Sequence, residues 1–177
     1  MFSKTIQFQK KFSLEAPQDS KTSTEEYPSE VKLFSLKLVR EGKVPFRAEL
    51  VNKPSSSANI ISKILRSKDR EHLVVVALDT KLYPVGINIT HIGTLNSTLV
   101  SPREVFKFAL LSNAAAVILG HNHPSGILDP STQDLDVTKT LIQIGKSLDI
   151  PVYDHIIVAP FNKGWISLRT THPSLFI

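Results

Sequence analysis

Two short, uninterrupted apolar runs are the feature that most constrains the fold of this chain. The first spans Leu73 to Leu78 (LVVVAL) and the second spans Ala114 to Leu119 (AAAVIL). Both have the length of a strand, and apolar side chains at successive positions indicate burial on both faces. A sheet that is buried on both faces needs helices to cover it, so these runs favour an α/β protein.

Helical and extended patterns alternate around the two runs. Ile60, Ile61 and Ile64 fall on one helical face, and Ser101 followed by Pro102 is typical of a helix start. A long amphipathic helix is predicted over 132–148. We therefore predict a mixed sheet covered by helices in three layers. The other predicted elements are helices over about 57–67 and from 101 onward, and strands over 82–92, 152–158 and 165–168.

The N-terminal part of the chain differs in composition from the rest. Residues 1–30 are polar and mixed in charge, so they bury too little apolar surface to order themselves, and a flexible arm is expected. Residues 31–54 are expected to lead into the domain, as a strand over 31–39 (VKLFSLKLV) and a linker over 53–57 ending in helix-capping residues. The main domain is then expected over 55–177.

Composition limits the chemistry that is available to the chain. It has no cysteine, which excludes disulfides, thiolate nucleophiles and cysteine-ligated metal sites. No apolar run reaches the roughly 18 residues of a membrane span, and the first residues lack a signal-peptide segment, so we expect a cytoplasmic protein without a membrane partner. The net charge of +5 permits nucleic acid as a partner but is too small to indicate one.

The strongest chemical signal is a pair of histidines followed by an aspartate. His121 and His123 lie two residues apart just after a predicted strand, so both side chains point the same way. Asp134 follows a tight loop, in the first turn of the next helix. Two imidazoles and one carboxylate can hold a metal ion and leave one position for water, as a hydrolytic site requires.

Each of these residues also has a purely structural interpretation. A single histidine at a strand end is usually a half-buried polar residue, and Ser131 with Asp134 has the spacing of a capping box. The combined spacing of the histidine pair, serine and aspartate favours the metal site over these separate explanations.

The same residues resemble a known signature. His121-x-His123, seven residues, Ser131, two residues and Asp134 resemble the JAMM (MPN-plus) metalloprotease motif, and the surrounding sequence resembles the RadC branch of that superfamily over about residues 55–170. The segments that carry the RadC resemblance, in chain order, are Gly93-Thr94-Leu95, Pro102-Arg103-Glu104-Val105-Phe106, His121-Asn122-His123-Pro124-Ser125-Gly126 and Asp154-His155-Ile156-Ile157.

The resemblance implies a fold and a set of roles. It implies zinc bound by His121, His123 and Asp134, with Ser131 donating a hydrogen bond to the developing oxyanion. It also implies cytidine-deaminase-like α/β layering of the JAB/MPN type. Two departures stand out: the helix–hairpin–helix region of longer RadC proteins is not recognisable, and Ser101 stands where relatives often carry histidine.

A hydrolase of this type also needs an acid/base residue, which in JAMM enzymes is a glutamate upstream of the histidines. Glu71 follows a predicted helix and begins a predicted strand, as in the family. If that strand runs antiparallel to the one before His121, its start lies beside the histidine pair. Glu104 is the alternative, although its spacing from Ser101 suggests a capping box. We predict Glu71 as the general base.

Two functions follow from these observations. The first is a zinc-dependent metallopeptidase or isopeptidase that uses an activated water on a peptide or isopeptide substrate. The alternative is a DNA-repair or recombination-associated protein that binds nucleic acid, with a zinc site of other or no catalytic role. A zinc nucleobase deaminase is excluded, because its signature requires a Pro-Cys-x-x-Cys segment and the chain has no cysteine. Substrate identity and oligomeric state are not predicted.

Overall fold

The computed structural model describes residues 32–45, 50–93, 100–160 and 164–177 of the protein. The chain divides into two units, Met1–Ser35 and Leu36–Ile177, and every described helix and strand belongs to the second. The flexible arm predicted over 1–30 lies outside the described residues.

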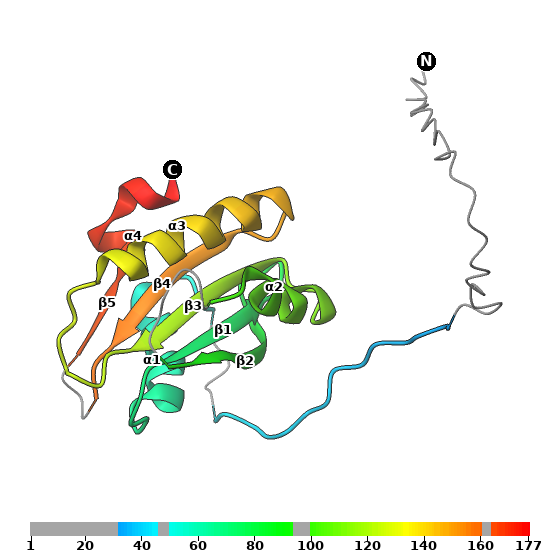
Figure 1. Ribbon diagram of the computed structural model, residues 1–177, viewed down its shortest axis with the longest axis horizontal. Helices are drawn as coiled ribbons and strands as arrows, with labels where there is room; N and C mark the ends of the chain where they lie inside the picture. Colours follow the sequence, from blue (N-terminus) through cyan, green and yellow to red (C-terminus); the bar gives the residue numbers. More distant parts are fainter. Residues whose placement is uncertain (1–31, 46–49, 94–99, 161–163) are drawn as a thin grey trace, which may run out of the picture. The chain divides into compact units, whose positions relative to one another are not determined.

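A mixed five-stranded sheet forms the centre of the second unit (Figure 1). Its strand order is β2-β1-β3-β4-β5. Strands β3 and β4 are parallel, and the other neighbouring pairs are antiparallel. In chain order the strands are β1 (His72–Leu78), β2 (Pro84–Ile92), β3 (Ala116–Asn122), β4 (Val152–Val158) and β5 (Trp165–Ser167).

Helices cover both faces of this sheet. Helix α1 packs with one buried cluster, whereas α2 and α3 pack with a second cluster on the opposite face (Figure 1). The predicted three-layer α/β fold is therefore confirmed. The helices are α1 (Pro54–Leu65), α2 (Pro102–Leu111), α3 (Thr132–Ser147) and α4 (Leu168–Thr171), followed by the 3-10 helix η1 (Pro173–Phe176).

The two apolar runs form the neighbouring inner strands, and all residues of β1 and β3 are buried. Side chains alternate between the faces of a strand. Leu73 and Val75 accordingly belong to the cluster under α2 and α3, whereas Val74 and Val76 belong to the cluster under α1. Burial on both faces explains why the two runs contain no polar residue.

The strand predicted over 31–39 is wrong for its described residues. Residues 32–45 form no helix or strand, and Leu33 is 100% exposed. A strand needs a neighbour to satisfy its backbone groups, and alternating apolar residues do not supply one. Helix α1 also begins earlier than predicted: Pro54 occupies its first turn, so most of the linker predicted over 53–57 is helical. Proline suits this position because its missing N–H has no partner there.

Two further details differ from the sequence prediction. Strand β3 continues through His121 and Asn122 instead of ending before them. Ser101 is the N-cap of α2, but its side chain makes no cap hydrogen bond, and the carboxylate of Glu104 pairs with Lys107. The predicted Ser101–Glu104 capping box is therefore wrong. Among the described residues, the structure contains no helix that is long and apolar enough to cross a bilayer.

Candidate metal centre

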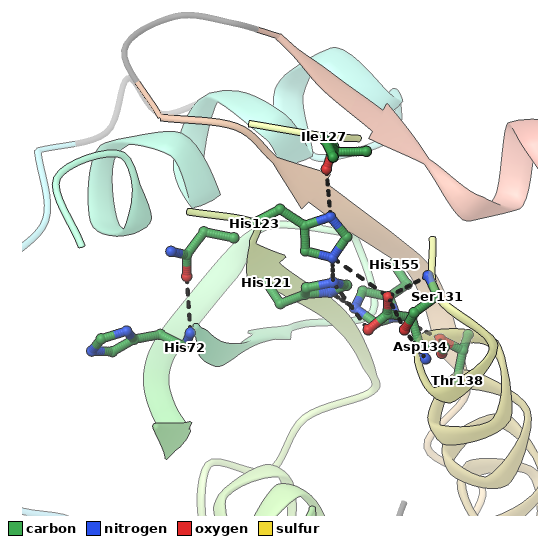
Figure 2. A network of polar contacts seen from close by, with 9 residues as sticks. His72, His121, His123, Ile127, Ser131, Asp134, Thr138 and His155 are labelled. Carbon is green, nitrogen blue, oxygen red and sulfur yellow. Dashed lines mark hydrogen bonds and ion pairs between the residues drawn. The ribbon is translucent and has the colours of Figure 1, made fainter. Parts of the chain in front are cut away.

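The histidine pair lies at the end of the central strand β3. His121 is in the strand and His123 follows it, held by a hydrogen bond from its N–H to the carbonyl of Val158 (2.9 Å). Because alternate residues of an extended segment point the same way, the two rings meet. Their Nε2 atoms lie 2.9 Å apart (Figure 2).

Asp134 approaches the same point from the first turn of α3. Its carboxylate Oδ1 lies 3.3 Å from Nε2 of His121, and its Oδ2 lies 3.4 Å from Nε2 of His123. The side chain is held there by a reciprocal capping box with Ser131, the N-cap of α3. The structure thus brings together all three predicted ligands, whose ligand atoms lie within 4.8 Å of one another and can hold a metal ion.

The protonation states suit a cation. Burial lowers the pKa of His121 well below its ordinary value, and the nearby His155 lowers it further. Burial opposes ionisation of Asp134, but the hydrogen bond with His123, the electrostatic interaction with His121 and the hydrogen bonds from Ser131 outweigh it and hold the pKa of Asp134 well below its usual range. Burial also lowers the pKa of His123, but its hydrogen bonds with Asp134 and Ile127 raise the pKa overall. The cluster therefore presents an ionised carboxylate beside a neutral imidazole.

The second nitrogen of each ring has its own partner (Figure 2). His123 Nδ1 lies 2.6 Å from the carbonyl oxygen of Ile127, and His121 Nδ1 lies 2.8 Å from Nε2 of His155. A carbonyl oxygen can only accept, so His123 carries a proton on Nδ1 and directs Nε2 at the cluster. Histidines that bind metals are commonly held in this way by a partner on the other nitrogen.

His155, on β4, is fully buried beside His121. Burial lowers its pKa to about 4, so it is neutral near neutral pH. The preceding residue, Asp154, has a structural role: its carboxylate accepts hydrogen bonds from the Ser167 hydroxyl (2.7 Å) and from the backbone N–H of Arg169 (3.1 Å). These contacts tie Asp154 to the C-terminal segment and leave His155 in contact with His121, outside the group of three candidate ligands.

Glu71 lies immediately before β1, which pairs antiparallel with β3 so that Leu73 faces His121. Continuing this register by two residues brings Glu71 opposite His123. Burial lowers the pKa of His123, and hydrogen bonds raise it; both effects are larger than that of Glu71. The negative charge of Glu71 also helps to raise this pKa. Glu104, the alternative base, is exposed and paired with Lys107.

Asn122, between the two histidines, fixes the backbone on both sides of Glu71. Its Oδ1 accepts from the N–H of His72 (2.9 Å), and its Nδ2 donates to the carbonyl of Arg70 (3.0 Å). The carbonyl of Glu71 accepts from the N–H of Gly93 (2.8 Å). These contacts hold the start of β1 against the end of β3.

Ser131 is exposed at the edge of the cluster, and its hydroxyl is used within the capping box. Oγ accepts from the N–H of Asp134 (3.1 Å) and donates to Asp134 Oδ2 (2.7 Å). The structure thus shows the capping interpretation of Ser131 directly and places the hydroxyl beside the predicted ligands.

Two contributors were not found from the sequence. Thr138 Oγ1 lies 2.6 Å from Nδ1 of His155, and the Ile127 carbonyl holds His123. Thr138 stands four residues after Asp134, which puts both on one helical face, so helical spacing is a signal that points to Thr138. The Ile127 contact involves a backbone carbonyl, which no side-chain pattern reveals.

Comparison with known proteins agrees with this architecture. The RadC-like JAB domain family matches residues 51–173. A UPF0758 protein of Desulfitobacterium hafniense (strain DSM 10664 / DCB-2) is 44% identical over 125 residues, which cover 71% of this chain and 54% of the relative. A UPF0758 protein of Clostridium acetobutylicum is 42% identical over 124 residues, which cover 70% of this chain and 53% of the relative. A UPF0758 protein of Thermosynechococcus vestitus is 37% identical over 129 residues, which cover 73% of this chain and 51% of the relative.

The chain spans about half the length of these curated relatives. The family match begins at Val51, which is fully buried, and includes the sheet, helices α1 to α3 and the cluster. It extends over more than half of the chain, and the structure shows the five-stranded, helix-covered sheet expected of a JAB/MPN fold. The protein belongs to the RadC-like JAB domain family.

Proposed function

We propose that the protein is a zinc-dependent hydrolase of the JAMM type that cleaves peptide or isopeptide bonds. The observation that carries this proposal is the convergence of two imidazole nitrogens and one carboxylate on one point, from β3 and from the start of α3. Among the described residues, this is the one group of three or more such side chains with the closeness that metal binding requires.

The donor set fits zinc. Zinc binds histidine nitrogen and carboxylate oxygen at about 2.0–2.2 Å, so two ligand atoms of a tetrahedral site are about 3.3 Å apart. The two Nε2 atoms are 2.9 Å apart, and each ring lies close to a different oxygen of Asp134: Oδ1 is 3.3 Å from His121 Nε2, and Oδ2 is 3.4 Å from His123 Nε2. Three protein ligands leave a fourth position open, as in catalytic zinc sites. A zinc ion bound by such ligands supplies Lewis-acid chemistry and lowers the pKa of water.

In this proposal Glu71 is the general base. It takes a proton from the water that attacks the carbonyl carbon and delivers it to the amine nitrogen when the C–N bond breaks. Its position two residues before Leu73, which faces His121, with Asn122 holding the backbone on both sides of Glu71, supports this role. Glu104 is a poorer candidate because its carboxylate is paired with Lys107 on the surface of α2.

Ser131 is proposed to stabilise the oxyanion. Ser131 is an exposed residue and its hydroxyl lies next to Asp134, so a substrate carbonyl at the cluster comes within its reach. The role requires the hydroxyl proton to turn from Asp134 Oδ2 to the substrate oxygen. A hydrogen-bond donor directed at a developing oxyanion is typically worth about 10²–10³ in kcat.

The test joins metal analysis to a cleavage assay on a panel of peptides and isopeptides. The purified chain is expected to bind one equivalent of zinc, and His123→Ala is expected to lose it. His172→Ala, at the C-cap of α4 and outside the cluster, should retain it. Glu71→Gln should keep zinc but lose about 10²–10⁴ of its turnover. Glu104→Gln is the matched control and should behave like the unsubstituted protein. Full zinc in His123→Ala, or undiminished turnover in Glu71→Gln, would overturn the corresponding assignment.

A further inference from the structure

A line of buried hydrogen bonds joins two of the proposed ligands through residues outside the ligand set. His121 Nδ1 lies 2.8 Å from His155 Nε2, and His155 Nδ1 lies 2.6 Å from Thr138 Oγ1. The Thr138 hydroxyl donates to the backbone carbonyl of Asp134, one turn earlier in α3. His121, His155 and Thr138 each have 0% exposure, so water does not replace any of these partners. We call this set of contacts the Thr138–His155 link (Figure 2).

The direction of hydrogen-bond donation along the link follows from the bond between Thr138 and the carbonyl of Asp134. The carbonyl oxygen of Asp134 can only accept, and Thr138 has one hydroxyl proton, which it donates there. Thr138 Oγ1 is then the acceptor for a proton on Nδ1 of His155. A neutral imidazole carries one proton, so His155 Nε2 is an acceptor and must receive a proton from His121 Nδ1. Nε2 of His121 is left with its lone pair, directed toward His123 and Asp134.

We propose that Thr138 and His155 are positioning residues that hold His121 in its Nδ1–H tautomer and thereby present His121 Nε2 to a cation. This inference rests on the zinc site of the proposed function. The opposite direction would place a proton on Nε2 of His121, facing Oδ1 of Asp134 at 3.3 Å, and would block the ligand atom. It also requires the Thr138 proton to leave the Asp134 carbonyl and turn to His155.

The link connects three elements of the fold. His121 comes from β3, His155 from the parallel neighbour β4, and Thr138 from α3. The register sets Leu119 against His155 and His121 against Ile157, so the two histidines are offset by two residues across the strands. Thr138 reaches His155 from the helix that also carries Asp134. The link therefore fixes the ligand from the strand relative to the ligand from the helix.

The first test reads the tautomers directly. Long-range ¹H–¹⁵N spectra of the full chain are recorded at pH 8, in the presence of a chelator that removes all metal. Protons on Nδ1 of both His121 and His155 are the expected result. A proton on Nε2 of His121 in these spectra would overturn the proposal, whether or not the protein binds zinc.

The second test measures zinc affinity by competition with a chelating dye. Thr138→Val removes the hydroxyl and should weaken zinc binding about 10- to 100-fold, whereas Thr138→Ser should restore it. Thr140→Val is the matched control, because Thr140 makes the same type of hydroxyl-to-carbonyl bond on α3, to Asp136 (2.9 Å), and is exposed. Equal zinc affinity in Thr138→Val and Thr138→Ser would contradict the inference.

The two tests separate this inference from the proposed function. If Thr138→Val does not fold, the spectra of the unsubstituted protein decide the question without it. If the unsubstituted protein binds no zinc, the proposed function fails, and the tautomer of His121 still shows whether the link holds the ring as inferred.

Discussion

Gly120 lies so close to Ile61 that a Cβ atom at position 120 would be 2.6 Å from both Cδ1 and Cγ2 of Ile61. Gly120 is in β3, directly before His121, and Ile61 is a fully buried residue of α1. The contact shows that glycine is required here for the close approach of helix and strand, not for an unusual backbone angle.

Gly120→Ala is therefore expected to destabilise the protein by about 1–3 kcal/mol through overpacking. Urea unfolding monitored by circular dichroism measures the change. Gly42→Ala is the matched control, since nothing lies within 4 Å of a Cβ at position 42. Adding Ile61→Ala to Gly120→Ala should cost less than the sum of the two single changes. Additive effects would show that the contact is not the cause.

Zinc should stabilise the folded protein, because the ligand atoms converge only when β3 and α3 are in place. With free zinc about 100-fold above its Kd, the stabilisation is about 2.7 kcal/mol, or a rise in Tm of about 5–10 °C. Asp134→Asn should abolish the rise, and Asp136→Asn, an exposed position on the same helix, should retain it. Differential scanning calorimetry with and without zinc decides between these outcomes.

The metal-free protein should lose stability in mild acid because of His155. Its pKa is about 4 in the folded protein and about 6.5 in the unfolded chain, so below pH 6.5 the unfolded state binds the proton first. Stability then falls as the pH drops from 6.5 to about 4, by about 3 kcal/mol from this residue. His121, whose pKa burial also lowers, adds to the fall in the same direction.

Urea unfolding at a series of pH values between 7 and 4.5, with chelator present, tests this dependence. His155→Gln should be less stable at pH 7 but should show a shallower loss on acidification. The raised pKa of His123 does not hide this loss of stability. The stabilisation that comes from protonating His123 is fully present below pH 6.5 and is lost only as the pH rises above it. If the free energy of unfolding of His155→Gln falls as steeply with pH as that of the unsubstituted protein, residues other than His155 cause the loss of stability in acid.

Asn122 is predicted to affect turnover without being a ligand. Asn122→Ala removes both side-chain bonds that hold the backbone around Glu71, each worth about 0.5–1.5 kcal/mol. In the proposed hydrolase, kcat should fall about 10-fold or more while zinc content stays at one equivalent. Asn88→Ala, at an exposed position of β2, is the control. Loss of zinc together with activity would show that Asn122 supports the histidines instead of Glu71.

The sequence was sufficient where the signal is local. The runs Leu73–Leu78 and Ala114–Leu119 predicted the inner strands, because two-sided burial demands apolar residues at successive positions. The resemblance to the RadC branch was confirmed by the family match. His121, His123 and Asp134 could be grouped because one strand, one loop and one helical turn carry all three.

Prediction failed where a contact depends on partners distant in sequence. The stretch over 31–39 has the alternation of a strand, yet its described residues have no neighbour that makes them one. Glu104 was predicted to cap α2, but Lys107 one turn later offers a charged partner. Thr138 and His155 meet only because β4 lies parallel to β3 under α3, and no spacing in the sequence gives that pairing.

The three proposed ligands lie within residues 121–134, a continuous segment, whereas Glu71 directly precedes β1 and His155 lies in β4. Closing so short a loop costs little chain entropy, so the proposed ligand set depends on β3 and α3 alone, whereas the proposed general base depends on a strand distant in the sequence. A change that loosens the start of β1 but leaves β3 and α3 in place would therefore impair the proposed base before it disturbs the ligands.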